Sequence, residues 1–161
     1  MRHSALVILF CLLSAVPVLS DVVVFPAPGA SGGKAQRLVI YSSLDSPHAR
    51  PLIESFQRRA PDVEVWYEEL LTGEIAARVV EETDSRRATA DLIFTSAMDL
   101  TVKLANDGYA REVSVQAADT WPDWAAWRSM VFALTFEPAV IVYHRPAFPE
   151  GPPDTRAELM D

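Results

Sequence analysis

The sequence predicts an α/β fold in which a mainly parallel sheet is flanked by helices. Short, continuous apolar runs at residues 37–41, 63–67 and 90–95 alternate with stretches whose apolar residues recur at helical spacing. Continuous apolar runs are typical of parallel strands, which are buried on both faces. The helical stretches begin at capping residues and end near proline or glycine. This alternation favours parallel strands joined by right-handed crossovers.

Composition narrows the class of protein further. The chain has 161 residues, half of them apolar, which is enough for about one folded domain. Its 22 acidic and 14 basic residues give a net charge of -8, which disfavours nucleic acid and anionic membrane surfaces as partners. Cys11 is the only cysteine, and the three histidines are scattered, so neither a disulfide framework nor a zinc-type spacing is predicted. We therefore expect no cofactor.

The first 20 residues have the pattern of a secretory signal. A basic start is followed by an uncharged apolar run at residues 5–15, by Pro17, and by small residues before Asp21. We predict cleavage after Ser20 and export; an uncleaved N-terminal anchor is the alternative. Residues 21–36 are rich in proline and glycine and are interpreted as a flexible leader, with a short edge strand at residues 22–25 as the alternative.

A first α/β lobe is predicted over residues 37–110. The first strand is followed by a helix with Asp45 or Ser46 as N-cap and an apolar face of Leu52, Ile53 and Phe56. Further along, a second helix covers residues 72–82 and a third covers residues 99–106, ending at Asp107-Gly108. These elements complete the order strand, helix, strand, helix, strand, helix.

Residues 111–161 differ in character. Trp121, Trp124 and Trp127 recur at intervals of three, and strand-like runs follow at residues 130–136 and 139–143. The final residues begin a newly capped helix, and the chain stops one turn into it. We interpret this region as a crossover followed by the truncated start of a second lobe.

The order of these features resembles the N-terminal half of periplasmic solute-binding proteins of ABC importers, of the ferric-ion-binding and phosphonate-binding type. The residues that carry the resemblance are LVIYSSLD at 38–45, PLIESFQRRAPDVEVWY at 51–67, TGEIAARVV at 72–80, ADLIFTSAMDL at 90–100, KLANDGYA at 103–110 and AWRSMVFALTFEPAVIVYHRP at 126–146. The resemblance implies a type II periplasmic-binding-protein lobe that is incomplete, since such proteins have two lobes around a ligand cleft. Residues 136–143 would correspond to the strands that cross between the lobes.

Candidate ligand-binding residues follow the ends of the predicted strands, because ligands of open α/β sheets bind there, beside helix N-termini. We expect them to be Ser42, Ser43, Asp45, Thr72, Gly73, Ser96, Ala97 and Glu137. Ser43, Thr72 and Ser96 could instead serve only as helix caps, and Glu137 could be a solvated turn carboxylate.

The resemblance does not carry an iron site over to this chain. Ferric-binding relatives use a histidine or acidic residue after the first strand and a glutamate after the third; here Asp45 is permissive, but Ala97 is not. The metal ligands are therefore unknown. The three tryptophans are interpreted as packing rather than as a ligand platform, and His144 as a histidine near a hinge rather than a ligand.

The leading functional hypothesis is a periplasmic, monomeric binding component of an ABC transporter that captures a small anionic or metal-containing solute for an inner-membrane permease. No nucleophile-elbow, zinc-protease or nucleotide-loop motif is present, so an enzyme is not predicted. The alternatives are an exported sensing module that passes its ligand to a signalling protein, and a non-functional truncated fragment.

Overall fold

The computed structural model describes residues 22–30, 33, 35–115, 121–138, 140, 142–149, 151–152, 155 and 157–158. The predicted signal at residues 1–20 and the helix start at Asp154 lie outside the described residues. Among the described residues, no helix is both long enough and apolar enough to cross a membrane.

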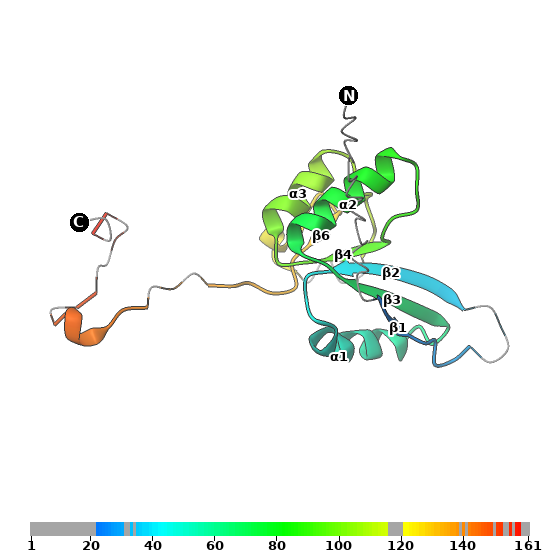
Figure 1. Ribbon diagram of the computed structural model, residues 1–161, viewed down its shortest axis with the longest axis horizontal. Helices are drawn as coiled ribbons and strands as arrows, with labels where there is room; N and C mark the ends of the chain where they lie inside the picture. The colour runs from blue at the N-terminus through cyan, green and yellow to red at the C-terminus, as the bar shows by residue number, and fades with distance from the viewer. Residues whose placement is uncertain are drawn as a thin grey trace, which may run out of the picture.

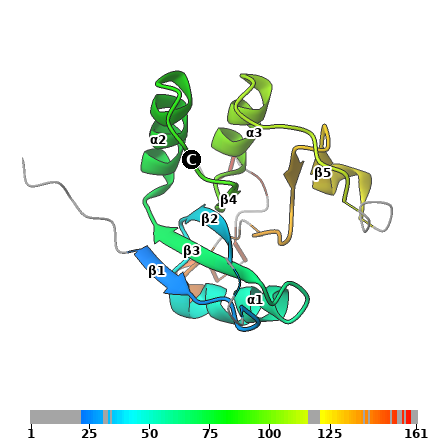
Figure 2. The same cartoon turned by 90° about the vertical axis from the view of Figure 1, so that its right-hand side faces the viewer.

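A four-stranded sheet forms the centre of the fold, with β2 and β3 parallel and β4 added to the other side of β2 (Figure 2). Its strands, in spatial order, are β1 (Val22–Phe25), β3 (Val63–Glu69), β2 (Gln36–Ser42) and β4 (Leu92–Phe94). Only β1 is antiparallel, and it lies at the edge beside β3. The predicted parallel-rich sheet is therefore confirmed.

Helices cover both faces of the sheet (Figures 1 and 2). They are α1 (Ser46–Gln57) on one face, and α2 (Thr72–Asp84) with α3 (Met98–Asn106) on the other. The chain moves from β2 to β3 in one direction and from β3 back past β2 to β4 in the other. Right-handed crossovers in opposite directions place their helices on opposite faces, which explains the two layers.

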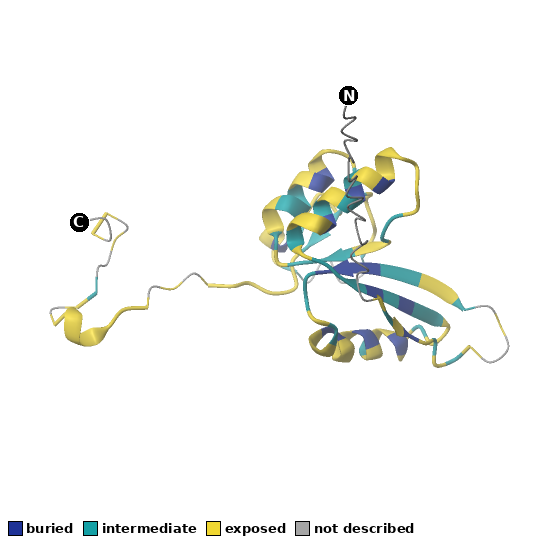
Figure 3. Cartoon of the chain, in the orientation of Figure 1, coloured by how far each residue is buried: buried dark blue, intermediate teal, exposed yellow. Residues whose placement is uncertain are grey.

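Two hydrophobic clusters fill the spaces between the layers. Figure 3 marks the buried residues on the sheet and on the helices that flank it. One joins α1 to the sheet through Ile53 and Val65, and the other joins α2 and α3 to the sheet through Ile75 and Leu104. The predicted apolar face of α1 is partly wrong: Ile53 is buried, but Leu52 and Phe56 are exposed at 54% and 40%. The buried face is instead formed by Ala49, Ile53 and Gln57.

The polar side chain of Gln57 can be buried because its amide group bonds to backbone carbonyls of neighbouring segments. Its Nε2 lies 2.9 Å from the Val63 carbonyl and 3.1 Å from each of the Phe25 and Pro26 carbonyls. These contacts hold the end of β1 against the start of β3, together with the edge-on contact of the Phe25 and Tyr67 rings at 6.4 Å. The leader interpretation is therefore corrected for Val22–Phe25, which forms the edge strand.

A polar network ties α2 to the sheet. Tyr41 of β2 donates a hydrogen bond to Glu82 Oε2 at 3.0 Å, and Arg78 Nε donates to Glu82 Oε1 at 2.8 Å. Arg78 also pairs with Glu68 of β3, and its guanidinium lies 4.4 Å from the centroid of the Tyr41 ring.

Burial raises the pKa of Tyr41 to about 12, and the hydrogen bond to Glu82 acts in the same direction. Burial alone would raise the pKa of Glu82, but hydrogen bonds, above all that from Arg78, outweigh it and hold the pKa below its ordinary value.

The chain after α3 forms less regular structure than its apolar runs predict. A short hairpin pairs β5 (Ala126–Trp127) with β6 (Val131–Phe132), after the 3-10 turn η2 (Asp123–Ala125). The described residues of the predicted strands at 130–136 and 139–143 form no further strand, and residues 133–138 are exposed. An extended run becomes a strand only where a neighbour supplies its hydrogen bonds, and within the described residues only β5 does so. A further 3-10 turn, η3 (Arg145–Ala147), follows the exposed His144.

Candidate functional site

The carboxyl ends of the three parallel strands lie at one edge of the sheet. Ser42, the last residue of β2, is level with Glu69 at the end of β3 and with Phe94 at the end of β4. From this edge the chain enters α1 on one face and α3 on the opposite face. The ends of β2 and β4 therefore form a switch point, where the chain leaves neighbouring strands in opposite directions. In open α/β sheets this crevice is the usual place for a ligand.

Hydroxyl groups bridge the switch point. Ser43 Oγ lies 2.9 Å from Thr95 Oγ1, and the Ser43 amide donates to the Phe94 carbonyl at 3.2 Å. Ser42 is fully buried; its Oγ donates to the same carbonyl at 2.6 Å and accepts from the Leu44 amide at 3.0 Å. Ser42 therefore supports the loop from below, whereas the half-buried Ser43 is placed where a solute can reach it.

The end of β3 holds the same loop from the other side. The Tyr67 hydroxyl donates to the Leu44 carbonyl at 2.6 Å, and the Leu70 amide donates to the Ser42 carbonyl at 2.9 Å. Glu69 Oε1 accepts a hydrogen bond of 2.7 Å from the Ser46 amide, at the first residue of α1. The β2–α1 loop is thus held by both neighbouring strands. A loop held in this way would lose less entropy if it bound a ligand.

Asp45 stands at the N-cap position of α1, as predicted, but its side chain makes no capping hydrogen bond and is 74% exposed. Its carboxylate lies 3.9 Å from His48 Nδ1. The capping contact comes instead from Glu69, which is 23 positions beyond Ser46 in the sequence. Asp45 therefore remains free to face solvent at the edge.

The N-terminus of α2 carries the second group of predicted residues. Thr72 is half-buried and begins the helix, and Gly73 is exposed. Glu74 closes the preceding turn by accepting a hydrogen bond of 3.0 Å from the Leu71 amide. A Cβ added at Gly73 would meet no atom within 4 Å, so neither space nor a positive φ in this structure requires a glycine there.

At α3, Ser96 is exposed and Ala97 is the half-buried N-cap. The Ala97 amide donates to Thr95 Oγ1 at 3.3 Å, and the Met98 amide donates to the Ser96 carbonyl at 2.9 Å. Thr95 thus connects the β4–α3 loop to Ser43, a role that strand register reveals and sequence spacing does not.

The structure brings seven of the eight predicted residues to this edge: Ser42, Ser43, Asp45, Thr72, Gly73, Ser96 and Ala97. The eighth, Glu137, lies in the exposed, non-strand stretch of residues 133–138. Glu69, Tyr67 and Thr95 were missed. The sequence contains one signal for Glu69: it is an acidic residue at the end of a strand, close to the start of a helix, where negative charge is favoured.

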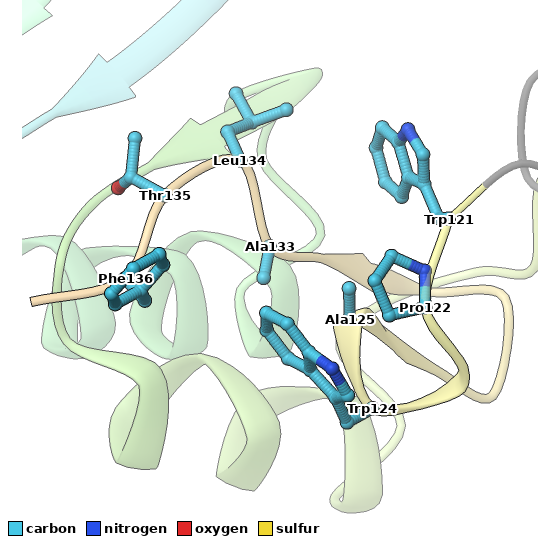
Figure 4. A pocket seen from close by; sticks show the side chains of 8 residues that line it. All are labelled: Trp121, Pro122, Trp124, Ala125, Ala133, Leu134, Thr135 and Phe136. Carbon is cyan, nitrogen blue, oxygen red and sulfur yellow. The ribbon is translucent and has the colours of Figure 1, made fainter.

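A separate apolar pocket of about 240 Å³ lies at the β5–β6 hairpin (Figure 4). Its lining comprises Trp121, Pro122, Trp124, Ala125, Ala133, Leu134, Thr135 and Phe136, none of which was predicted to bind ligand. Trp121 packs edge-on against Phe132 at 5.4 Å, as expected for a packing residue. Trp124 and Trp127 do not follow that expectation, being 71% and 46% exposed. With Thr135 as the only hydroxyl-bearing side chain in its lining, the pocket offers little to a charged solute.

The described residues contain no group of three or more histidine, cysteine, aspartate or glutamate side chains that could hold a metal ion. The edge does carry carboxylates at the start of each helix: Glu69 beside α1, Glu74 in α2 and Asp99 in α3. Each of these acids lies where a helix N-terminus favours negative charge.

The fold and its strand-end edge therefore define an α/β lobe of the kind that binds a small ligand at a switch point. A crystal structure of the substrate-binding protein of an ABC transporter from Agrobacterium tumefaciens is similar to this chain, with 56% identical residues and a TM-score of 0.72. The match covers 89% of this chain and 42% of that one, so the chain spans less than half the length of its neighbour. Neither a protein-family model nor a curated protein matches the chain. The neighbour confirms the predicted fold class, a parallel-rich sheet flanked by helices.

Proposed function

We propose that this protein is the extracytoplasmic solute-binding component of an ABC transporter and that it delivers its solute to an inner-membrane permease. The observation that supports this role is the 56% identity to a substrate-binding protein of an ABC transporter over 89% of the chain. The edge formed by Ser43, Thr95 and the N-termini of α2 and α3 is the surface that faces the solute. In this role the chain binds and releases its ligand without chemical change.

The solute is a small anion or a metal-containing complex, as in the ferric-ion-binding and phosphonate-binding proteins that the sequence resembles. The N-terminal amides of a helix favour anions, and the exposed Gly73 lets a ligand approach the backbone of α2 closely. A net charge of -8 does not prevent this, because charges beyond about 8 Å are largely screened at physiological salt.

Calorimetric titration of the mature chain, residues 21–161, tests the solute class. Phosphate, sulfate and ferric citrate are compared with ethanolamine, and we expect at least one of the first three to bind and ethanolamine not to bind. Ser43→Ala removes the hydroxyl that bridges to Thr95 and should weaken binding about three- to tenfold. Ser114→Ala removes an exposed hydroxyl after α3 and should change nothing. Binding of ethanolamine without binding of any oxyanion would refute the proposed solute class.

Gly73→Ala separates folding from binding. Alanine is the better helix former by roughly 0.5–1 kcal/mol, and the added Cβ meets no atom of this fold, so thermal stability should hold or rise slightly. If a solute approaches the backbone of α2, the methyl group will lie in its path and affinity will fall. Differential scanning calorimetry and ligand titration measure the two effects. Unchanged affinity in a stabilised variant would remove α2 from the proposed site.

Export is tested by N-terminal sequencing of the protein recovered from the periplasm. We expect the mature chain to begin at Asp21 and to elute as a monomer in size-exclusion chromatography. A cytoplasmic chain that still begins at Met1 would contradict the proposed location.

A further inference from the structure

The amides of the first turn of α1 all have partners within the protein. The Ser46 amide donates to Glu69 Oε1 at 2.7 Å, and Pro47 has no amide hydrogen. The amides of His48 and Ala49 donate to the Asp45 carbonyl at 2.9 and 3.1 Å. Residues 46–49 of α1 therefore offer no unpaired amide to a ligand, although they stand at the same edge as the starts of α2 and α3.

Glu69 occupies the position that an anionic group of a ligand would take at α1. Its carboxylate has the charge and the acceptor geometry that a helix N-terminus favours. Its position is set by the sheet, since Glu69 is the last residue of β3 and lies level with Ser42 of β2. Two further contacts from the end of β3, from Tyr67 to Leu44 and from Leu70 to Ser42, hold the loop next to this carboxylate.

We infer that Glu69 is a specificity-determining residue of the proposed binding edge, an inference that rests on the proposed function. By filling the start of α1 with a fixed negative charge, Glu69 excludes anionic groups from that end. The exposed carboxylate of Asp45 lies next to the filled position and adds to the repulsion. The part of the solute that faces α1 is therefore neutral or cationic, with hydrogen-bond donors.

The inference is tested with sulfate as probe. The backbone amide signal of Ser46 is followed in the isotope-labelled mature chain, residues 21–161, at constant ionic strength. In the wild-type protein the signal should not titrate with sulfate. Glu69→Ala uncovers the amide, and the signal should then shift saturably. Glu69→Gln keeps an acceptor oxygen but removes the charge, so the Ser46 amide should stay protected. Because Glu69→Gln removes a negative charge, the affinity of this variant for phosphate elsewhere on the edge should rise about two- to fivefold at low salt.

Glu64→Ala is the matched control, because Glu64 lies on the same strand and carries the same charge but accepts its hydrogen bond from the Trp66 indole rather than from α1. It should leave the Ser46 signal unresponsive to sulfate. A sulfate response of Ser46 in the wild-type protein, the same gain in Glu64→Ala, or no gain in Glu69→Ala would each overturn the inference. The outcome does not depend on the native solute, so it stays separate from the titrations that test the proposed function.

Discussion

Replacing Arg78 with methionine should lower the free energy of unfolding by about 2–3 kcal/mol, which corresponds to a fall in Tm of roughly 5–10 °C for a domain of this size. Methionine keeps much of the apolar stem but leaves Glu82 and Glu68 without the guanidinium that joins them. Glu82 is 7% exposed, so its charge then has little solvent to replace the lost partner. The expected loss is smaller than for a fully buried pair because a third of the Arg78 side chain is exposed.

Urea unfolding at neutral pH measures the change. Arg87→Met is the matched control, because Arg87 pairs with Glu81 at 2.7 Å on the solvent side. This variant should lose less than about 1 kcal/mol in the free energy of unfolding. Adding Glu82→Gln to Arg78→Met should recover part of the loss, since it removes the stranded charge. Equal losses in the two arginine variants would show that the network contributes no more than a surface ion pair.

The network also sets an acid limit on stability. The pKa of Glu82 is lowered in the folded state, so its contribution is complete above the ordinary pKa of 4.5 and is lost as the pH falls through the lower folded value. In Arg78→Met the hydrogen bond that lowers this pKa most is absent, so the same acidification should destabilise the variant less than the wild-type protein.

The strands and helices of the first lobe could be predicted because their apolar periodicity reflects burial on one face or on both. The error at α1 has a physical reason. Leu52, Ile53 and Phe56 form an apolar stripe, but the stripe that packs is rotated towards Gln57, a polar residue whose burial depends on carbonyls of β1 and β3. Such a contact depends on which segments meet in space, and helical spacing does not contain that information.

The residues of the candidate site could be grouped from the sequence, but their hydrogen-bond partners could not be predicted. Parallel strands bring their carboxyl ends to one edge, so Ser43, Thr72 and Ser96 could be grouped from strand order alone. The hydrogen-bond partners of Ser43 and Ser46 could not be predicted in this way. Thr95 and Glu69 reach them through the register of β4 and β3 with β2. The prediction for Glu137 depends on a crossing strand, and the described residues around it form none.

Stability should also fall as the pH rises from 10 to about 12, and Tyr41 should account for roughly 2 kcal/mol of the loss. Burial raises the pKa of Tyr41 to about 12, so the folded state retains a phenol proton that the unfolded chain has already released. A raised folded pKa gives stability that is complete below the unfolded pKa and is lost as the pH passes through the folded one. The low exposure of Tyr41, 3%, means that solvent screening reduces this figure little.

Urea unfolding of the wild-type protein and of Tyr41→Phe, measured at intervals between pH 8 and pH 12, isolates this contribution. Tyr41→Phe should be less stable near neutral pH, because Glu82 loses a hydrogen bond, but its curve should decline less in alkali. Tyr67, whose pKa burial also raises, titrates in both proteins and cancels from the difference. The two curves should therefore converge between pH 10 and pH 12, and parallel curves over that range would show that the Tyr41 phenol ionises as readily in the folded protein as in the unfolded chain.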